Sequence, residues 1–321
     1  MSNIIICLFV SDGFDKAAQG LTGAAQRLAQ QVGRQLHAII FGTGAGELAS
    51  EVARFVDKVV VADQSATAEY APESCLNALA QLTKDARIVL LSNDIYSQEI
   101  APRLAHRLGG SAVGDGVAVE MQNGAVRVTR QVYGGKAEAV IELKRSPAVV
   151  WLRSRSFDPA AARAKEGEII RAVLDVKPDT RTRVVERKRE DSGTARLEDA
   201  RIIVSGGRGI GGPEPFSNEL QLLADLLGAQ MAATRAACDA GWVPATWQVG
   251  QTGKKVAPEL YLAIAISGAS QHLAGISEAK NIAAINTDAE APIFKHCRLG
   301  VVGDYRKLVP LIRERLEPVC K

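Results

Sequence analysis

The chain has 321 residues, of which 47% are hydrophobic and 23% are charged, and it carries a formal net charge of +3 at pH 7. This length favours two compact domains, and the composition is ordinary for a globular α/β protein and argues against a disordered chain. The small, evenly spread charge excludes the electrostatic footprint that nucleic acid or an anionic membrane surface requires, so we expect small ligands or protein partners and no nucleic acid.

The cysteines and the N-terminal segment indicate the cellular setting. The five cysteines are odd in number and contain no C-x-x-C pair, which favours a reducing compartment over a disulfide framework or a zinc site. The apolar run at residues 4–10 lacks the basic flank and cleavage site of a signal peptide, and predicts a first buried strand. No apolar stretch approaches the ~20 residues that span a bilayer. We therefore expect a bacterial cytoplasmic protein that has no transit peptide and is not inserted in a membrane.

Short apolar runs rich in Ile and Val alternate with segments of helical period in the first third of the chain. The pattern predicts strands at residues 4–10, 36–41, 58–62 and 87–92 and helices at residues 17–34, 45–55, 74–82 and 98–108. Alternation of this kind implies right-handed crossovers and a parallel sheet that is covered on both faces.

The pattern then changes to alternating apolar and polar residues. It predicts strands at residues 117–121, 126–132, 137–143 and 148–152, with the hairpin signal Asn123-Gly124 between the first two. We expect these strands to be antiparallel and to extend the edge of the first sheet.

A charged segment marks the domain boundary. Between residues 181 and 191 the signs of the charges are mixed and aromatic residues are absent, which favours a solvated linker over a nucleic-acid patch. We place the boundary near Asp191, with an N-terminal α/β domain at residues 1–190 and a C-terminal domain at residues 191–321.

Strand and helix alternation resumes after the linker. The pattern predicts strands at residues 200–204, 229–233, 260–266, 281–285 and 299–302 and helices at residues 216–227, from 269, and at 305–316. This is a second doubly wound, Rossmann-like unit, and ligands of such sheets lie beyond the carboxyl ends of the strands. Glycine, hydroxyl, amide and charged residues follow these strand ends, so we expect a binding site there.

The glycine-rich turn at residues 205–212 follows a strand and precedes a helix, as a phosphate-binding turn does. Its spacing matches neither common phosphate-binding motif, so a flexible connection is an equally good interpretation of the glycines alone. Arg208 within the turn favours a pyrophosphate.

The segment from Ser267 to His272 is open to two interpretations. Ser267 is placed to cap a helix, and a single histidine such as His272 is usually structural or exposed. A charged His272 near a helix N-terminus needs an anion close by, and a reduced flavin supplies one. Hydrolysis is disfavoured because no G-x-S-x-G motif occurs, and Cys238 among alanines is better interpreted as packing than as a redox group.

The C-terminal half resembles the α subunit of electron transfer flavoprotein. The resemblance is ordered and nearly continuous from about residue 200 to 312, whereas the first domain matches mainly at residues 101–105 and 132–135. It is carried by VSGGRGI (204–210), TRAACDAG (234–241), QVGQTGK (248–254), VAPELY (256–261), ISGASQHLAG (266–275), AIN (284–286), AEAPIF (289–294) and VGD (302–304).

This resemblance implies an electron carrier without a small-molecule substrate of its own. It implies a heterodimer with a β subunit, contacted by the N-terminal domain, and one FAD held chiefly by the C-terminal domain, with AMP as a ligand of the β subunit. Electrons would pass from flavoprotein dehydrogenases to a membrane quinone oxidoreductase.

The resemblance also assigns residues to parts of the cofactor. Arg208 would lie near the glycine turn, Thr234 and Arg235 near the isoalloxazine, and His272 at its C2 oxygen. The remaining residues are Val249, Gly250, Gln251 and Thr252 at the polar edge of the ring, Ser267, Gly268, Ala269, Ser270 and Gln271 at the ribityl-pyrophosphate, and Asn286, Asp304 and Tyr305 toward the adenosine.

On this hypothesis Arg235 and His272 act as positive donors that stabilise the reduced, negatively charged flavin. Two other classes remain as alternatives. The chain could be an NAD-dependent α/β enzyme, or a flavin-free module that binds an adenine nucleotide. Neither alternative requires the residues at 250–252 and at 267–272 to occur together.

Overall fold

The computed structural model describes residues 3–10, 13–64, 67, 70–135, 137–153, 157–178, 185 and 197–319. The chain divides into two compact units. The first comprises Met1–Val132 and Glu138–Lys188, and the second comprises Tyr133–Ala137 and Arg189–Lys321. The predicted boundary at Asp191 lies outside the described residues.

The first unit is built on one sheet with strand order β7-β6-β5-β8-β4-β1-β2-β3-β9. The strand order reverses direction between β1 and β4, as in doubly wound sheets. Strands β5 and β6 are antiparallel and β7 continues that edge. The strands are β1 (Ile4–Phe9), β2 (Leu36–Phe41), β3 (Lys58–Ala62), β4 (Ile88–Ser92), β5 (Ser111–Gln122), β6 (Ala125–Val132), β7 (Ala137–Leu143), β8 (Ala148–Leu152) and β9 (Glu168–Arg171).

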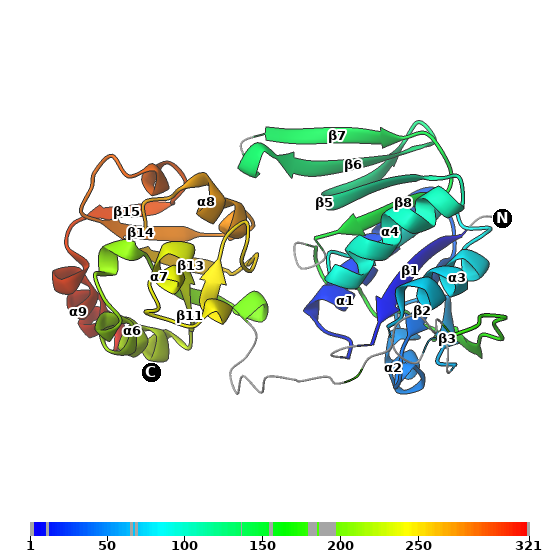
Figure 1. The fold of residues 1–321 in the computed structure, drawn as a ribbon, viewed down its shortest axis with the longest axis horizontal. Coiled ribbons are helices and arrows are strands. Elements are labelled where there is room, and N and C mark those ends of the chain that lie inside the picture. The colour runs from blue at the N-terminus through cyan, green and yellow to red at the C-terminus, as the bar shows by residue number, and fades with distance from the viewer. Residues whose placement is uncertain are drawn as a thin grey trace. The chain divides into compact units, whose positions relative to one another are not determined.

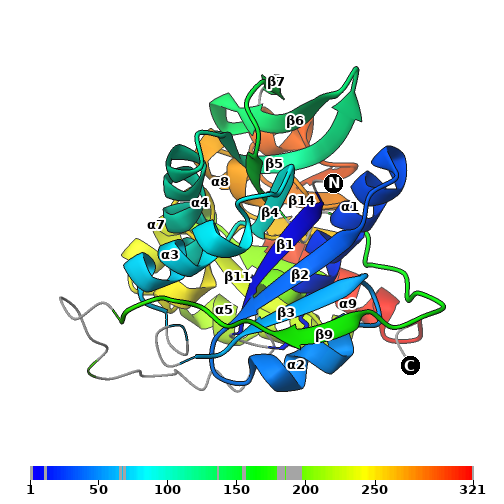
Figure 2. The same cartoon turned by 90° about the vertical axis from the view of Figure 1, so that its right-hand side faces the viewer.

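Helices cover both faces of this sheet because its central strands are apolar on both sides. In β1, Ile4 and Ile6 lie in one core and Ile5 and Cys7 lie in the other. Helices α1 (Lys16–Val32) and α2 (Ala45–Val52) pack on the first core, and α3 (Pro72–Leu82) and α4 (Ile95–Arg107) pack on the second. Figure 2 shows α3 and α4 on one side of the sheet and α1 on the other.

Two strands of the first unit differ from the sequence prediction. Strand β8 was expected at the antiparallel edge, but it pairs in parallel with both β4 and β5. Its sequence AVVWL is nearly continuous in apolar residues, which is typical of a central parallel strand. Strand β9 was not predicted, because its four residues EIIR are short and flanked by charge, and it pairs with the edge strand β3.

The second unit contains a fully parallel sheet with strand order β12-β11-β10-β13-β14-β15. Its strands are β10 (Ile202–Gly206), β11 (Gln230–Thr234), β12 (Gln248–Val249), β13 (Leu260–Ile264), β14 (Ile282–Asn286) and β15 (Leu299–Val302). The order reverses between β10 and β13, so this unit is also doubly wound. The predicted fold class, with two mainly parallel sheets and an antiparallel edge on the first, is confirmed.

The helices of the second unit also form two layers. One layer contains α5 (Glu214–Ser217), α6 (Glu219–Leu227) and α9 (Tyr305–Leu316), and the other contains α8 (Ser270–Ile276). Figure 1 shows α6 and α9 together on one side of this unit and α8 on the other. The single helix predicted at residues 216–227 is divided at Asn218, whose backbone is not helical, and β12 and α7 (Arg235–Asp239) were not predicted.

Among the described residues, none of the helices combines the length and the apolar composition needed to cross a bilayer. The described part of the chain likewise contains no group of three His, Cys, Asp or Glu residues that could hold a metal ion.

Candidate functional site

A cleft of about 750 Å³ lies at the carboxyl ends of the strands in the second unit. It is lined by residues at or just after the carboxyl ends of β10, β11, β12, β13 and β14, so it lies where the strand order reverses. Most of the predicted site residues line it, namely Arg208, Thr234, Arg235, Val249, Gly250, Gln251, Thr252, Ser267, Ala269, Gln271, His272 and Asn286. Arg208 and Asn286, which are 78 residues apart in the sequence, are thus brought to one edge of the sheet.

Four predicted residues do not line the cleft: Gly268, Ser270, Asp304 and Tyr305. Asp304 caps α9 by accepting a hydrogen bond from the Arg306 amide at 3.0 Å. The Tyr305 side chain is buried, and its hydroxyl donates to the carbonyl oxygen of Ile210 at 2.7 Å. Tyr305 therefore supports the glycine turn, and its contact with an adenosine remains a prediction.

The glycine turn comes close to the neighbouring strand end. A Cβ atom at Gly207 would lie 2.1 Å from the carbonyl oxygen of Ala265, so only glycine fits there. Ala265 itself has φ +53°, a left-handed conformation that is strained for a residue other than glycine. Strain of this kind is common at ligand sites, and here it lies on the wall of the cleft.

Two donors on the wall of the cleft have no partner within the described part of the chain. The Oγ1 atom of Thr234 is buried and makes no hydrogen bond. The Arg208 side chain is exposed, and no described residue forms a hydrogen bond or an ion pair with it. Because buried polar groups are rarely left unpaired, the Thr234 hydroxyl indicates a ligand atom, and the free guanidinium suits an anion.

Arg235 has a counter-ion. Its Nε atom lies 3.2 Å from Oδ2 of Asp239, one helical turn along α7, and both side chains are largely exposed. Asp239 also lines the cleft. The carboxylate therefore offsets part of the positive charge that Arg235 brings to the site.

His272 is buried and both of its ring nitrogens have partners. Nδ1 lies 3.1 Å from the carbonyl oxygen of Val249 and Nε2 lies 3.0 Å from the hydroxyl of Tyr261. Burial lowers the pKa of His272 to about 4, although the hydrogen bond to Val249 raises it in part. His272 is therefore neutral near pH 7 in this chain alone, because desolvation disfavours the imidazolium. Its charge beside a reduced flavin stays a prediction.

Two of the predicted binding segments, residues 249–252 and 267–272, lie against each other. The Gln251 amide donates to the carbonyl oxygen of Gln271 at 2.7 Å, which ties the loop after β12 to the start of α8. Ser267 does not cap this helix as expected, because the chain turns at Gly268 and the cap position is Ala269. The hydroxyl of Ser267 is thus not engaged as a helix cap.

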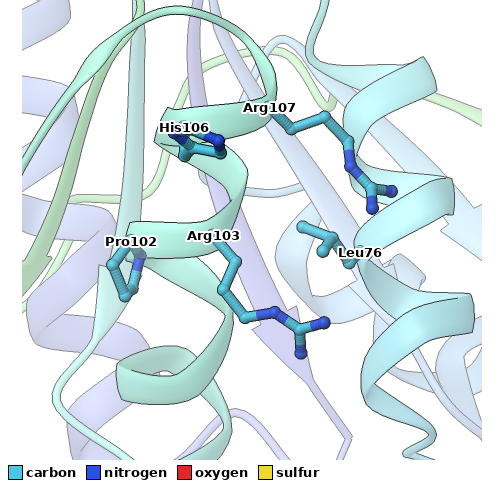
Figure 3. Close-up of a pocket in the computed structure, with 5 residues that line it drawn as sticks. All are labelled: Leu76, Pro102, Arg103, His106 and Arg107. Carbon is cyan, nitrogen blue, oxygen red and sulfur yellow. The ribbon is translucent and has the colours of Figure 1, made fainter.

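A second hollow lies in the first unit between α3 and α4. Figure 3 shows Arg103 and Arg107 reaching from α4 toward the helix that carries Leu76. Arg103 forms ion pairs with Glu73 and Glu99, so its charge is already balanced. The cleft in the second unit therefore offers the better set of donors for an anionic ligand.

Several residues that line the cleft were not among the individually predicted cofactor contacts, although Gly207 and Gly209 belong to the predicted glycine turn. They are Gly207, Gly209, Ala236, Asp239, Gln248, Ala265, Ile266 and Asp288. Asp239 could have been found from its position four residues after Arg235 on a helix. Ala265 could not, because nothing in the sequence marks a left-handed backbone at an alanine.

The fold and the cleft define a doubly wound α/β protein with a ligand site at the switch point of its second sheet. Comparison with protein families gives two matches. Residues 196–277 match a family described as electron transfer flavoprotein FAD-binding domain, and residues 10–177 match the electron transfer flavoprotein domain. The chain belongs to the electron transfer flavoprotein α subunit family.

Full-length relatives agree with this assignment. The electron transfer flavoprotein subunit alpha of Thermoanaerobacterium thermosaccharolyticum is 36% identical over 304 residues, covering 92% of each chain. The subunit of the same name from Syntrophomonas wolfei is 36% identical, covering 90% of this chain and 92% of the relative. That of Pseudomonas aeruginosa is 37% identical, covering 88% of this chain and 90% of the relative.

Proposed function

We propose that the chain binds FAD in the cleft of its second unit and pairs with a β subunit to form a heterodimeric electron carrier. In this proposal it accepts electrons from flavoprotein dehydrogenases and passes them to a membrane quinone oxidoreductase. It has no small-molecule substrate of its own, and AMP is a ligand of the β subunit.

The observation that carries the proposal is the unpaired donor set on the cleft wall. Thr234 has a buried hydroxyl without a partner in the described chain, and Arg208 presents a free guanidinium beside the glycine turn. A dinucleotide with a pyrophosphate and a ring that accepts hydrogen bonds matches both groups. The match of residues 196–277 to an FAD-binding domain supports FAD as that dinucleotide.

The bound FAD would supply the redox chemistry, and the residues of this chain would bind and tune it. Arg208 and the amides of its turn suit the pyrophosphate, since charge-assisted hydrogen bonds to phosphate are strong. Thr234 and Arg235 line the cleft beside β11 and would face the ring. Arg235 would be the main cationic donor near the ring, because burial disfavours the charged form of His272. Gly250 to Thr252, held against α8 by the Gln251 amide, would border the polar edge of the ring.

The proposal is tested by measuring FAD affinity after co-expression with a candidate β subunit. Arg208→Gln should weaken FAD binding by about tenfold or more, since a charge-assisted hydrogen bond contributes roughly 1.5–3 kcal/mol. Arg201→Gln is the matched control, because Arg201 is exposed and its partner is Glu259, and neither residue lines the cleft. Equal affinities in the two variants would contradict the role of Arg208.

The same preparation distinguishes the proposal from its competitors. A colourless complex that turns over NAD would indicate a nicotinamide-dependent enzyme. Stoichiometric AMP or ATP without FAD would indicate an adenine-nucleotide module. Either result would contradict the proposed function.

A further inference from the structure

A buried tyrosine is connected to the cleft through His272. The Tyr261 hydroxyl lies 3.0 Å from Nε2 of His272, and Nδ1 of the same ring lies 3.1 Å from the carbonyl oxygen of Val249. Tyr261 is 0% exposed and does not line the cleft, whereas Val249 and His272 do. His272 therefore links the Tyr261 hydroxyl to the cleft.

The partners of the ring decide where its proton lies. A carbonyl oxygen only accepts hydrogen bonds, so Nδ1 must carry a proton and donate to Val249. The neutral ring then has a lone pair on Nε2, and the Tyr261 hydroxyl must donate to it. In the other neutral tautomer the proton is on Nε2, and the lone pair of Nδ1 would then face a lone pair of the Val249 carbonyl oxygen.

The surroundings of Tyr261 keep its hydroxyl a donor. Burial raises the pKa of its phenol well above the ordinary value. The hydroxyl therefore does not ionise in the accessible pH range. The ring lies on β13, in the core that also contains Val249, Ile266 and Ile276, so its position is fixed by packing.

We propose that Tyr261 is a positioning residue for the cleft, because its hydroxyl holds His272 in the Nδ1–H tautomer and fixes the orientation of the ring at the cleft wall. The effect of this on bound flavin rests on the proposed function. The assignment of the tautomer does not, because it follows from contacts within this chain.

The first test uses the full chain without any cofactor. Nitrogen-15 labelling of the four histidines, with His272 assigned by its loss in His272→Gln, reports which ring nitrogen carries the proton. We expect a protonated Nδ1 and an unprotonated, hydrogen-bonded Nε2. In Tyr261→Phe the Nε2 signal should shift toward that of a nitrogen without a donor. A proton on Nε2 in the unmodified chain would overturn the proposal whether or not the variant folds.

The second test asks whether Tyr261 acts through His272 on the cofactor. In the FAD-loaded complex, Tyr261→Phe should lower the midpoint potential, because the uncovered lone pair of Nε2 disfavours negative charge in the cleft. This shift should vanish when Tyr261→Phe is made in a His272→Gln background, since the two residues form one unit. Tyr70→Phe, which removes a hydroxyl that binds Glu99 in the first unit, is the control and should leave the potential unchanged.

The outcomes separate the two proposals. A persistent shift in the His272→Gln background would show that Tyr261 acts by packing alone and would overturn its positioning role. A complex that binds no FAD but shows the expected tautomer would contradict the proposed function and leave the assignment of the tautomer supported.

Discussion

At the scale of single residues, the buried imidazole of His272 links stability to pH. Its pKa is near 6.5 in the unfolded chain and is lowered to about 4 in the folded chain by burial. Between these values the unfolded chain binds more protons, so the free energy of unfolding falls as the pH falls from 6.5 toward 4, and His272 contributes no such loss above this window.

We therefore expect the pH dependence of stability to be weaker in His272→Gln. Between pH 7 and pH 5 this variant should lose about 2 kcal/mol less of its free energy of unfolding than the unmodified chain does. Denaturant unfolding at the two pH values measures the difference. His37, whose pKa is also lowered, is present in both proteins and cancels. Parallel pH profiles would show that His272 is not buried in neutral form.

The pair formed by Arg235 and Asp239 gives a second prediction at this scale. Arg235→Ala removes positive charge from the cleft and should lower the midpoint potential of bound FAD, whereas Asp239→Asn removes the counter-ion and should raise it. A shift of about 60 mV corresponds to a tenfold change for a one-electron step. Spectroscopic redox titration measures both variants, and an unchanged potential in Arg235→Ala with FAD still bound would contradict its role.

At the scale of elements, the turn that leads into α8 depends on Gly268. Its φ of +84° is left-handed, and an added Cβ atom would lie 2.4 Å from the amide nitrogen of Ile293. Gly268→Ala should therefore combine the conformational cost with a steric clash, destabilising the chain by about 3 kcal/mol. Gly228→Ala is the matched control, because Gly228 has φ +59° but open space around its Cβ position, and it should cost only about 1 kcal/mol.

Urea unfolding of the two variants checks this prediction. Equal losses would mean that the clash at Ile293 is relieved by a shift of the backbone. Gly268→Ala should also weaken FAD binding, since the displaced turn carries Ser267 and leads to His272, whereas Gly228→Ala should not.

The elements that the sequence predicted well are those with an unambiguous periodic pattern. The strand at 36–41 and the helix at 305–316 have the predicted bounds, because their apolar periods are regular and turn signals flank them. Strand β8 was wrongly assigned to the antiparallel edge, although it lies between β4 and β5 and is parallel to both, because a short apolar run does not report the direction of its neighbours. Strand β9 is short and charged at both ends, so only its pairing with β3 makes it a strand.

The sequence predicted the site as the residues that follow the strand ends, but it did not predict the charge or the contacts of the individual side chains. Residues that follow strands could be listed from the sequence, because parallel strands place their carboxyl ends at one edge. The charge state of His272 could not be predicted, since it depends on burial and on the hydrogen bond to the carbonyl oxygen of Val249, 23 residues away in the sequence. The sequence also could not separate Tyr305, which supports the glycine turn, from residues that line the cleft.

At the scale of the whole molecule, the two doubly wound units differ in the unpaired donors that they offer to a ligand. The described part of the second unit carries a cleft with unpaired donors at its switch point. In the hollow between α3 and α4 of the first unit, the arginine Arg103 is already paired with carboxylates. We therefore expect the cofactor to be held by the second unit.

The most direct test of this account is the FAD content of the complex between this chain and its β subunit. We expect one FAD per α chain after gel filtration, and a marked loss of FAD in Arg208→Gln but not in Arg201→Gln. An assembled, folded complex that retains no FAD would contradict the claim that the donors at these strand ends form a flavin site.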